Sequence, residues 1–363
     1  MSLSCHLFSI KRQGRYRIIR ILGIRIKIRS RYLALKEKLR SVENENNSKT
    51  RQIQQLSNKL NGLHRELNDL RRKDTYRFQR YASPDKYPLI LKDWFLDCTG
   101  EILNLDNPRT FNEKIQWMKL YDSTPIKSRL ADKYLVREWV AEKIGEQYLI
   151  PLLGVWDSFD DIDFSTLPDR YVLKCNHGCA YNLIVKNKNE LDQAKARQVF
   201  NRWMNEDFAY KAGLELHYSG ITRKIIAEAY IENTGSNEGD LYDYKFWCFN
   251  GKVKYIQFLS ERNTSGLKMA FYDLDWKKQD FVYSYPLDAK EIEKPDNLNE
   301  MITLAEKLAE GFNHVRVDFY RMDDGTLYFG EMTFTSASGI CKWVPAEMNR
   351  VIGDMMELPE LSH

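Results

Sequence analysis

The first strong pattern along the chain is a run of apolar residues spaced alternately by three and four positions, beginning at Tyr32. Such a heptad repeat places the apolar residues on one stripe of a helix and is typical of a coiled coil. Asn46 falls at a core a position, where this residue type selects parallel dimers at some cost in stability. The seam consists of Tyr32, Leu35, Leu39, Val42, Asn46, Lys49, Ile53, Leu56, Leu60, Leu63, Leu67 and Leu70.

We therefore predict that residues 32–74 form a parallel coiled coil, which joins copies of this chain into a homo-oligomer. A dimer is favoured, and a trimer stays open because Leu is the commonest residue of the seam. The alternative is a single helix that packs its apolar stripe against its own chain.

A different pattern precedes this helix, because isoleucines and basic residues alternate from Ile24 to Arg29. A period of two indicates a strand with one apolar and one cationic face. We predict that residues 1–31 form a basic arm, a small two-stranded unit bent at Gly23, that lies on an anionic membrane surface. A solvated basic tail is the alternative. A zipper-type DNA-binding region must be a continuous helix, which Gly23 and the isoleucines oppose, so we expect no nucleic acid partner.

The remaining residues, 75–363, combine helical and strand patterns and are expected to form one catalytic domain. Residues 110–113 form a capping box that opens a helix. A second helix is expected from near Asp132 to Gly145, with Lys133 in its first turn, where backbone N–H groups favour an anion. Strands are expected over residues 171–174, 183–185, 225–231, 242–249 and 252–259, with an Asn-Gly hairpin turn between the last two.

The most informative segment is a hairpin of residues 314–334, whose turn we take to be the two residues Asp324-Gly325. Two carboxylates then face each other with Cβ atoms about 5 Å apart, and like charges at that spacing repel. Mg²⁺ shared with phosphates would offset this repulsion, and a structural salt bridge is the alternative. The register pairs Tyr320 with Phe329, Asp318 with Glu331, and Arg316 with Thr333.

Four further charged residues fall on the expected strands. Lys174 ends a strand before the small-residue loop 176–181, an arrangement that can hold phosphate but that many ordinary hairpins share. Glu228 interrupts an apolar strand, where a carboxylate needs a partner. Asp243 and Lys245 lie on one face of their strand, and a solvated ion pair is the alternative to a role in a site.

Charge divides the chain into two parts. Residues 1–74 contain 19 Lys/Arg against 6 Asp/Glu, a net charge of +13, whereas residues 75–363 contain 36 against 45, a net charge of −9.

The six cysteines suggest no disulfide framework and no secretory signal precedes them, so a reducing cytoplasm is expected. Cys175 and Cys179 flank His177 without a second ligand pair, so we expect no zinc. No apolar run approaches the roughly 20 residues that span a bilayer.

Taken in order, the motifs of residues 107–359 resemble the ATP-grasp superfamily, in particular the TupA-like group named for teichuronopeptide synthesis. The resemblance implies an α+β fold in which two α+β lobes clamp ATP, with Mg²⁺ as the second cofactor. A full Rossmann-like preceding domain is missing, because residues 75–130 are too few to form one. The motifs are TFNEKIQWMKLYD, DKYLVREWV, YVLKCNHG, DYKFWCFNGK, RVDFY and YFGEMTFTSASG.

The same resemblance implies a role for each matching residue. Arg316 and Lys245 are the expected catalytic residues. The implied metal ligands are Asp318 and Glu331, with Thr333 at a third position that is commonly Asn in the wider superfamily. The implied ATP-binding residues are Lys133 and Lys174 at the phosphates, Asn176 and Gly178 in the lid loop, Glu228, Tyr230 and Ile231 at the adenine, and Asp243 at the ribose.

ATP-grasp enzymes mostly activate a carboxylate as an acylphosphate, which an amine then attacks. The resemblance therefore implies an ATP-dependent ligase that attaches an amino acid or other amino compound to a carboxylate of a bacterial surface polysaccharide, of the capsule, O-antigen or teichuronopeptide type. A lipid-linked glycan would meet the enzyme at the inner face of the cytoplasmic membrane, with the protein peripheral to it. The alternatives are a kinase of a sugar hydroxyl and a non-catalytic polysaccharide-assembly protein.

Overall fold

The computed structural model describes residues 8–13, 16–21, 24–29, 31–232, 242–260 and 267–360. The chain divides into two compact units, Met1–Asp74 and Thr75–His363. A search of the described helices finds none that is both long and apolar enough to cross a membrane.

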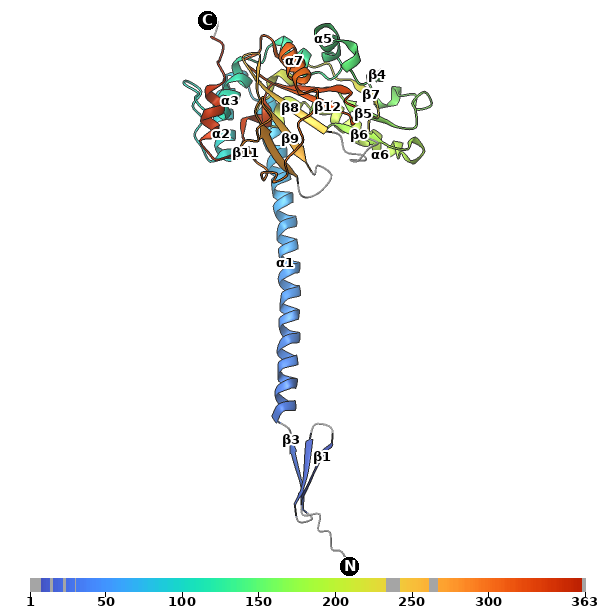
Figure 1. Cartoon of the computed structure of the whole chain (residues 1–363), viewed down its shortest axis with the longest axis vertical. Helices are drawn as coiled ribbons and strands as arrows, with labels where there is room; N and C mark the ends of the chain where they lie inside the picture. Colours follow the sequence, from blue (N-terminus) through green and yellow to red (C-terminus); the bar gives the residue numbers. More distant parts are fainter. Residues whose placement is uncertain are drawn as a thin grey trace, which may run out of the picture. The chain divides into compact units, whose positions relative to one another are not determined.

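The N-terminal unit consists of a three-stranded antiparallel sheet and one long helix (Figure 1). The expected two-stranded arrangement is wrong, because residues ahead of the alternating pattern add a third strand to the free edge of the central one. That strand takes up the backbone hydrogen bonds that the edge offers. The expected bend at Gly23 lies outside the described residues. The elements are β1 (Phe8–Gln13), β2 (Tyr16–Ile21), β3 (Ile24–Arg29) and α1 (Arg31–Tyr81).

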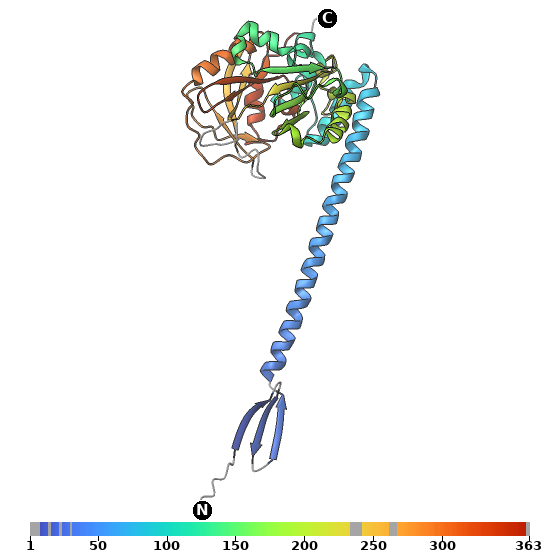
Figure 2. The ribbon, with the colours of Figure 1, turned by 90° about the vertical axis from the view of Figure 1, so that its right-hand side faces the viewer.

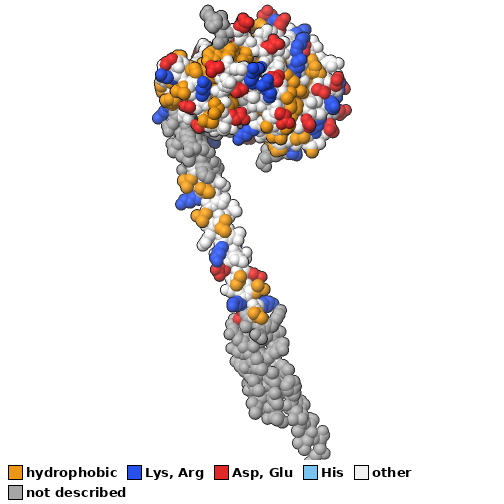
Figure 3. Space-filling model, turned by 90° about the vertical axis from the view of Figure 1, so that its left-hand side faces the viewer, with side chains coloured by type: hydrophobic (Ala, Val, Ile, Leu, Met, Phe, Trp, Pro, Cys, Tyr) orange, Lys and Arg blue, Asp and Glu red, His pale blue; other side chains and the backbone are white. Residues whose placement is uncertain are grey.

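The helix predicted from the heptad pattern is confirmed, and it runs without a break through Asp74 to Tyr81. Its apolar stripe lies on the surface of the single chain (Figure 3). The apolar heptad side chains between Leu35 and Leu63 keep 48% to 67% of their surface exposed. Pairing of this helix with another copy stays a prediction.

The C-terminal unit is built around two antiparallel sheets, of which the larger has five strands in the order β10-β9-β8-β12-β13 (Figures 1 and 2). The predicted Asn250-Gly251 turn joins β8 to β9, with φ of 49° and 74° at its two residues. Both residues have the positive φ that a type I′ turn requires. The strands are β8 (Tyr242–Phe249), β9 (Lys252–Ser260), β10 (Lys268–Tyr272), β12 (His314–Arg321) and β13 (Leu327–Thr333).

The smaller sheet has four strands in the order β4-β7-β5-β6 and its own apolar core against helix α6. The loop between β5 and β6 is the predicted small-residue loop. β7 ends at Ala229, so Tyr230 and Ile231 follow the strand instead of belonging to it. The elements are β4 (Leu152–Trp156), β5 (Tyr171–Cys175), β6 (Asn182–Val185), α6 (Gln193–Asn205) and β7 (Ile225–Ala229).

The five-stranded sheet separates two further cores. Phe246 and Val317 pack on the side of helix α7, whereas Trp247 and Phe249 pack with Phe111 of α3 on the other side. A short pair of strands, β11 (Val282–Tyr283) and β14 (Trp343–Val344), lies beside the second core. The remaining helices are α2 (Tyr87–Thr99), α3 (Phe111–Tyr121), α4 (Pro125–Ala131), α5 (Val136–Lys143), α7 (Leu298–Ala309) and α8 (Met348–Asp354).

The capping box at residues 110–113 is confirmed, and it opens α3. The helix expected from near Asp132 begins later, at Val136, because Asp132 instead ends α4. The Asp132 carboxylate accepts hydrogen bonds from the N–H groups of Tyr134 and Leu135, which stabilises a turn between the two helices. Lys133 therefore lies in this turn and not in the first turn of a helix.

Candidate active site

The predicted carboxylate pair lies on the hairpin of β12 and β13. Asp318 pairs with Glu331 and Arg316 with Thr333, as the sequence predicted. The two strands continue the five-stranded sheet, and β12 also pairs with β8, which places Lys245 directly opposite Asp318. One strand of the hairpin is thus central in the sheet, and its charged residues meet charges from both neighbouring strands.

The predicted pairing of Tyr320 with Phe329 is wrong, because Tyr320 faces Tyr328. The loop has three residues instead of two, with Gly325 at a φ of 86°. A bulge at Gly330 then adds one residue to β13, which shifts the register back. The two irregularities cancel, so the carboxylates meet although the turn was assigned incorrectly.

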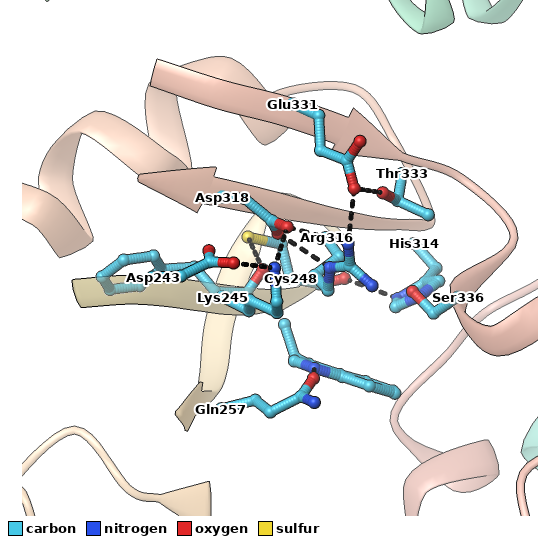
Figure 4. Close-up of polar contacts among 12 residues, drawn as sticks. Asp243, Lys245, Cys248, Gln257, His314, Arg316, Asp318, Glu331, Thr333 and Ser336 are labelled. Carbon is cyan, nitrogen blue, oxygen red and sulfur yellow. Dashed lines mark hydrogen bonds and ion pairs between the residues drawn. The ribbon is translucent and has the colours of Figure 1, made fainter. Parts of the chain in front are cut away.

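Arg316 bridges the two carboxylates (Figure 4). Its Nε donates to Asp318 Oδ1 at 2.7 Å, and its Nη2 donates to Asp318 Oδ2 at 2.8 Å and to Glu331 Oε1 at 2.7 Å. Asp318 is buried, whereas the Glu331 side chain is 34% exposed. The salt bridge that was the alternative to a metal is therefore present, and it joins the same carboxylates that a metal would use.

Lys245 extends this charge cluster toward Asp243. Its Nζ lies 2.6 Å from Asp318 Oδ2 and 2.7 Å from Asp243 Oδ2. The solvated ion pair considered for Asp243 and Lys245 is wrong, because both residues are buried on the central strand β8. With Arg316 and Glu331 included, three carboxylates surround two cations, a formal charge of −1 that leaves an attraction for a further cation.

The charges around Glu331 control its ionisation. Burial acts to raise the pKa of Glu331, but the positive charges of Arg316, Lys133 and Lys245 outweigh it and lower the pKa to about 2. Burial dominates at Asp318 and raises the pKa of that carboxyl. Thr333 donates a hydrogen bond to Glu331 Oε1 at 3.1 Å, so its hydroxyl supports the carboxylate from the neighbouring position on β13.

Lys133 connects the turn after α4 to the loop of residues 176–181. Its Nζ donates to the carbonyl oxygen of Gly178 at 2.6 Å, and its backbone N–H donates to the carbonyl oxygen of Asn176 at 3.1 Å. A Cβ at Gly178 would lie 2.7 Å from the ring of Phe208 and 2.8 Å from the ring of Tyr181, so the position requires glycine. The two hydrogen bonds of Lys133 thus attach the turn after α4 to the loop of residues 176–181.

Asn176, which the resemblance implies in the lid loop, lies where that loop leaves β5. Its side-chain amide donates to the carbonyl oxygen of Thr222 at 2.9 Å and accepts from the N–H of Lys224 at 2.7 Å. The residue is fully buried. Its side chain therefore fixes the base of the loop.

The loop lies close to the carboxylate hairpin. Lys133 lines one small pocket together with Gly330, Glu331 and Met332 of the hairpin. Because its Nζ also donates to the carbonyl oxygen of Gly178, Lys133 links the loop of the smaller sheet to the hairpin of the larger sheet.

A second charge cluster lies on the smaller sheet. Lys174 of β5 and Arg137 of α5 both donate to the carboxylate of Glu228, Arg137 at 3.2 Å. Glu228 is buried, and the cationic partner expected for a buried carboxylate is provided by both residues. Arg137 was not among the predicted site residues, although the need of a buried carboxylate for a cation was the signal that pointed to such a residue.

Two of the three residues implied at the adenine, Tyr230 and Ile231, lie directly after β7 and are half-buried. The guanidinium carbon of Arg170 lies 5.1 Å from the centre of the Tyr230 ring, a cation–π contact on its face. Ile231 follows it, one residue before the described segment ends at Glu232.

The donor atoms at the hairpin suit Mg²⁺. Asp318 and Glu331 supply carboxylate oxygens, which Mg²⁺ combines with water and substrate phosphates instead of a full cage of protein ligands. The described residues contain no group of three or more His, Cys, Asp or Glu side chains placed to hold a metal ion.

The two antiparallel sheets and the hairpin site define an ATP-grasp protein of α+β type. Residues 113–357 match the family model described as TupA-like ATPgrasp, and the chain belongs to this family. No curated protein matches the chain.

Several solved structures are similar at low identity. N5-carboxyaminoimidazole ribonucleotide synthetase in complex with ADP is 12% identical over 57% of this chain and 45% of that chain, with a TM-score of 0.35. D-alanine–D-alanine ligase from Bacillus anthracis with ATP is 16% identical over 63% and 65%, with a TM-score of 0.38. The ATP-grasp ligase PsnB with a minimal precursor, Mg and ADP is 11% identical over 60% and 56%, with a TM-score of 0.33. The chain thus spans about half to two thirds of the length of these proteins.

Proposed function

We propose that the protein is an ATP-dependent carboxylate–amine ligase that works through an acylphosphate. The observation that carries the proposal is the Arg316–Asp318–Glu331 cluster, to which Lys133 and the loop of residues 176–181 lie close. This arrangement gathers cations and metal-type ligands where a phosphoryl group could be transferred, and positioning with charge neutralisation is the main requirement of that chemistry.

In the proposed reaction, a carboxylate oxygen of the acid attacks the γ-phosphorus of ATP, and the bond to the bridging oxygen breaks to release ADP. The amine then attacks the acyl carbon, phosphate leaves with the bonding electron pair, and the amine loses a proton to give the amide. The acid's own oxygen anion needs no general base for the first step.

The chain's residues divide this work. Lys133 and Lys174 neutralise the phosphates, with Asn176 and Gly178 shaping the loop above them. Arg316, with Lys245 behind it, stabilises the charge that develops on the transferred group. Mg²⁺ held by Asp318 and Glu331, with Thr333 beside them, would neutralise charge on the β- and γ-phosphates. Glu228, Tyr230 and Ile231 would line the adenine, and Asp243 would lie toward the ribose.

The experiment that tests the reaction is a trapping assay. The purified full-length protein is incubated with ATP, a panel of uronic acid glycans and hydroxylamine, and both ADP and hydroxamate are measured. We expect ADP release that depends on a carboxylate acceptor, with hydroxamate in equal amount and no AMP. ATP turnover without any dependence on an acid would contradict the proposal.

A kinase of a sugar hydroxyl is the second candidate, because phosphoryl transfer from ATP requires the same cluster. It predicts a stable sugar phosphate and no hydroxamate in the same assay. A non-catalytic assembly protein predicts neither product. The three functions therefore give three different outcomes of one experiment.

For the substrate, we propose the carboxylate of a bacterial surface polysaccharide, carried as a lipid-linked glycan, and an amino acid or other amino compound as nucleophile. Membership of the TupA-like family supports this class, and the basic N-terminal unit fits work at an anionic membrane surface. Mass spectrometry of the surface glycan from cells with and without the gene should show loss of an amide-linked substituent. An unchanged glycan would contradict this assignment.

A further inference from the structure

The contacts of Arg316 leave few carboxylate oxygens for a metal. Its guanidinium donates hydrogen bonds to both oxygens of Asp318 and to one oxygen of Glu331, at 2.7 to 2.8 Å. Lys245 adds a contact to Asp318 Oδ2 at 2.6 Å. A divalent cation placed on these same oxygens would lie beside the guanidinium, and the two positive charges would repel in this buried site.

We propose that Arg316 is the built-in counter-ion of the carboxylate pair and competes with the divalent cation for it. Metal binding at Asp318 and Glu331 then requires nucleotide phosphates, which accept the guanidinium in a bidentate manner and draw it away. This inference rests on the proposed ATP-dependent function. It adds the order of binding, in which the metal binds together with the nucleotide and not before it.

Arg316 is better suited to this exchange than Lys245. Lys245 is buried between Asp318 and Asp243 and has a carboxylate on each side. Arg316 is tied on one side to Glu331, which is partly exposed and can follow a ligand. Moving Arg316 breaks one partly exposed contact to Glu331 and two contacts to Asp318, but Asp318 keeps its contact to Lys245. Moving Lys245 would instead remove a cation that two buried carboxylates share.

The test uses Mn²⁺ as the probe and the full-length protein without nucleotide. Electron paramagnetic resonance measures bound Mn²⁺, and thermal unfolding is recorded with and without the ion. For the wild type we expect weak Mn²⁺ binding that rises at least about tenfold when ADP is added. For Arg316→Gln we expect tight Mn²⁺ binding without ADP, and a lowered Tm that Mn²⁺ restores.

The control is Arg137→Gln, which removes an arginine from the Glu228 pair on the other sheet and should leave nucleotide-free Mn²⁺ binding unchanged. If Arg316→Gln does not fold, Arg316→Met replaces it, because it also removes the positive charge while keeping a long side chain. Either variant binding Mn²⁺ no better than the wild type would overturn the proposal, as would wild-type binding that ADP does not change. These readouts are independent of ligase turnover, so failure of the reaction in the trapping assay would leave them interpretable.

A separate observation concerns α1, whose apolar heptad side chains from Leu35 to Leu63 are exposed along the helix (Figure 3). Helices in proteins gain most of their stability from packing such an apolar stripe against another surface. We infer that α1 of a second copy of this chain covers the stripe, in parallel and in register.

Charge and polarity favour the parallel arrangement. In register, Lys38 at a g position lies near Glu43 at an e position of the other copy, an attraction that occurs twice in a dimer. Asn46 then faces its own counterpart, where the two amides can hydrogen bond. In the antiparallel alignment that pairs Tyr32 with Leu70, Asn46 would instead face Leu56 and lose that partner.

The experiment combines light scattering with cysteine cross-linking of the full-length chain. We expect a dimer, and we expect Val42→Cys to form a disulfide between the two copies under mild oxidation, because a parallel register brings the two positions together. The wild type, which has its own cysteines, is the control. A monomer in solution, or a Val42→Cys variant that cross-links no more than the wild type, would overturn this inference, and a trimer would correct its stoichiometry.

Discussion

Three carboxylates and two basic side chains share the face formed by β8, β12 and β13, and most of this cluster is buried. Short contacts hold the side chains of this cluster together, and their positive and negative charges nearly cancel. Removing one member leaves its partners charged and unpaired in a medium of low polarity, which costs more than the contact itself was worth.

Neutral substitutions of the two carboxylates should separate catalysis from stability. We expect Asp318→Asn and Glu331→Gln each to lower ATP turnover by at least about a hundredfold while the protein still folds. Asp318→Asn should destabilise the fold by about 3 kcal/mol because Arg316 and Lys245 both lose a buried partner, and Glu331→Gln by about 1 kcal/mol. Urea unfolding and an ADP-release assay measure the two effects. Normal turnover in both variants would refute the metal site.

His314 provides a test of acid stability beside the site. Its Nδ1 is 3.0 Å from the carbonyl oxygen of Cys248 and its Nε2 is 3.1 Å from Ser336 Oγ, and burial lowers its pKa from 6.5 to about 3. The unfolded chain therefore binds a proton that the folded protein does not, so stability is lost as the pH falls from 6.5 toward 3. The slope for this group is at most about 1.4 kcal/mol per pH unit.

We expect His314→Gln to be less stable than the wild type at pH 8 and to lose less stability on acidification below pH 6.5. Chemical unfolding at a series of pH values gives both quantities. Parallel pH profiles for the two proteins would contradict the assigned shift.

Among the elements, the β12–β13 hairpin depends on its bulge. A Cβ at Gly330 would lie 3.1 Å from the backbone oxygen of Asp318 and 3.4 Å from its Cβ, so any larger residue presses on the strand that holds the carboxylate. The bulge thus determines where Asp318 meets Glu331.

We expect Gly330→Ala to destabilise the protein by about 1–2 kcal/mol and to reduce ATP turnover further than this loss explains, because it moves Asp318 relative to Glu331. Gly325→Asn is the matched control on the same hairpin. Its φ of 86° is one that Asn tolerates, and a Cβ there meets no atom within 4 Å. Denaturation and turnover assays distinguish the two, and equal turnover in both variants would show that the bulge does not position the site.

At the scale of the whole molecule, a basic N-terminal unit precedes an acidic C-terminal unit along the chain. The positive charge of the first unit favours adsorption to anionic lipid. If α1 pairs in parallel, each oligomer presents its basic sheets at the same end, and binding by both at once is stronger than binding by one.

We expect the full-length protein to sediment with anionic vesicles and to be released by salt. Replacing Arg25, Lys27 and Arg29 together by Gln should weaken binding about a hundredfold, since each basic residue contributes about 1 kcal/mol near the surface. Replacing Arg170, Lys186 and Lys188 of the catalytic unit removes equal charge and serves as the control. Binding that is indifferent to salt and lipid charge would contradict the membrane assignment.

Several features followed from local sequence alone. The heptad period determined that α1 is a helix, and the Asn250-Gly251 pair determined a hairpin turn. Alternation along residues 314–334 placed Asp318 and Glu331 on the same face of their hairpin, although their direct pairing also needed the bulge. These signals work because helix and strand periods, and the positive φ of a type I′ turn, depend on residues close together in the chain.

Other features were decided only by the tertiary structure. Arg137 reaches Glu228 across 91 residues of sequence, and Lys245 lies between two buried carboxylates because β8 packs between β9 and β12. The third strand of the N-terminal sheet and the bulge at Gly330 likewise arise from pairing between strands. Local periodicity does not specify which elements become neighbours. It could therefore place Arg316 beside the two carboxylates, but not Lys245, which β8 brings opposite Asp318.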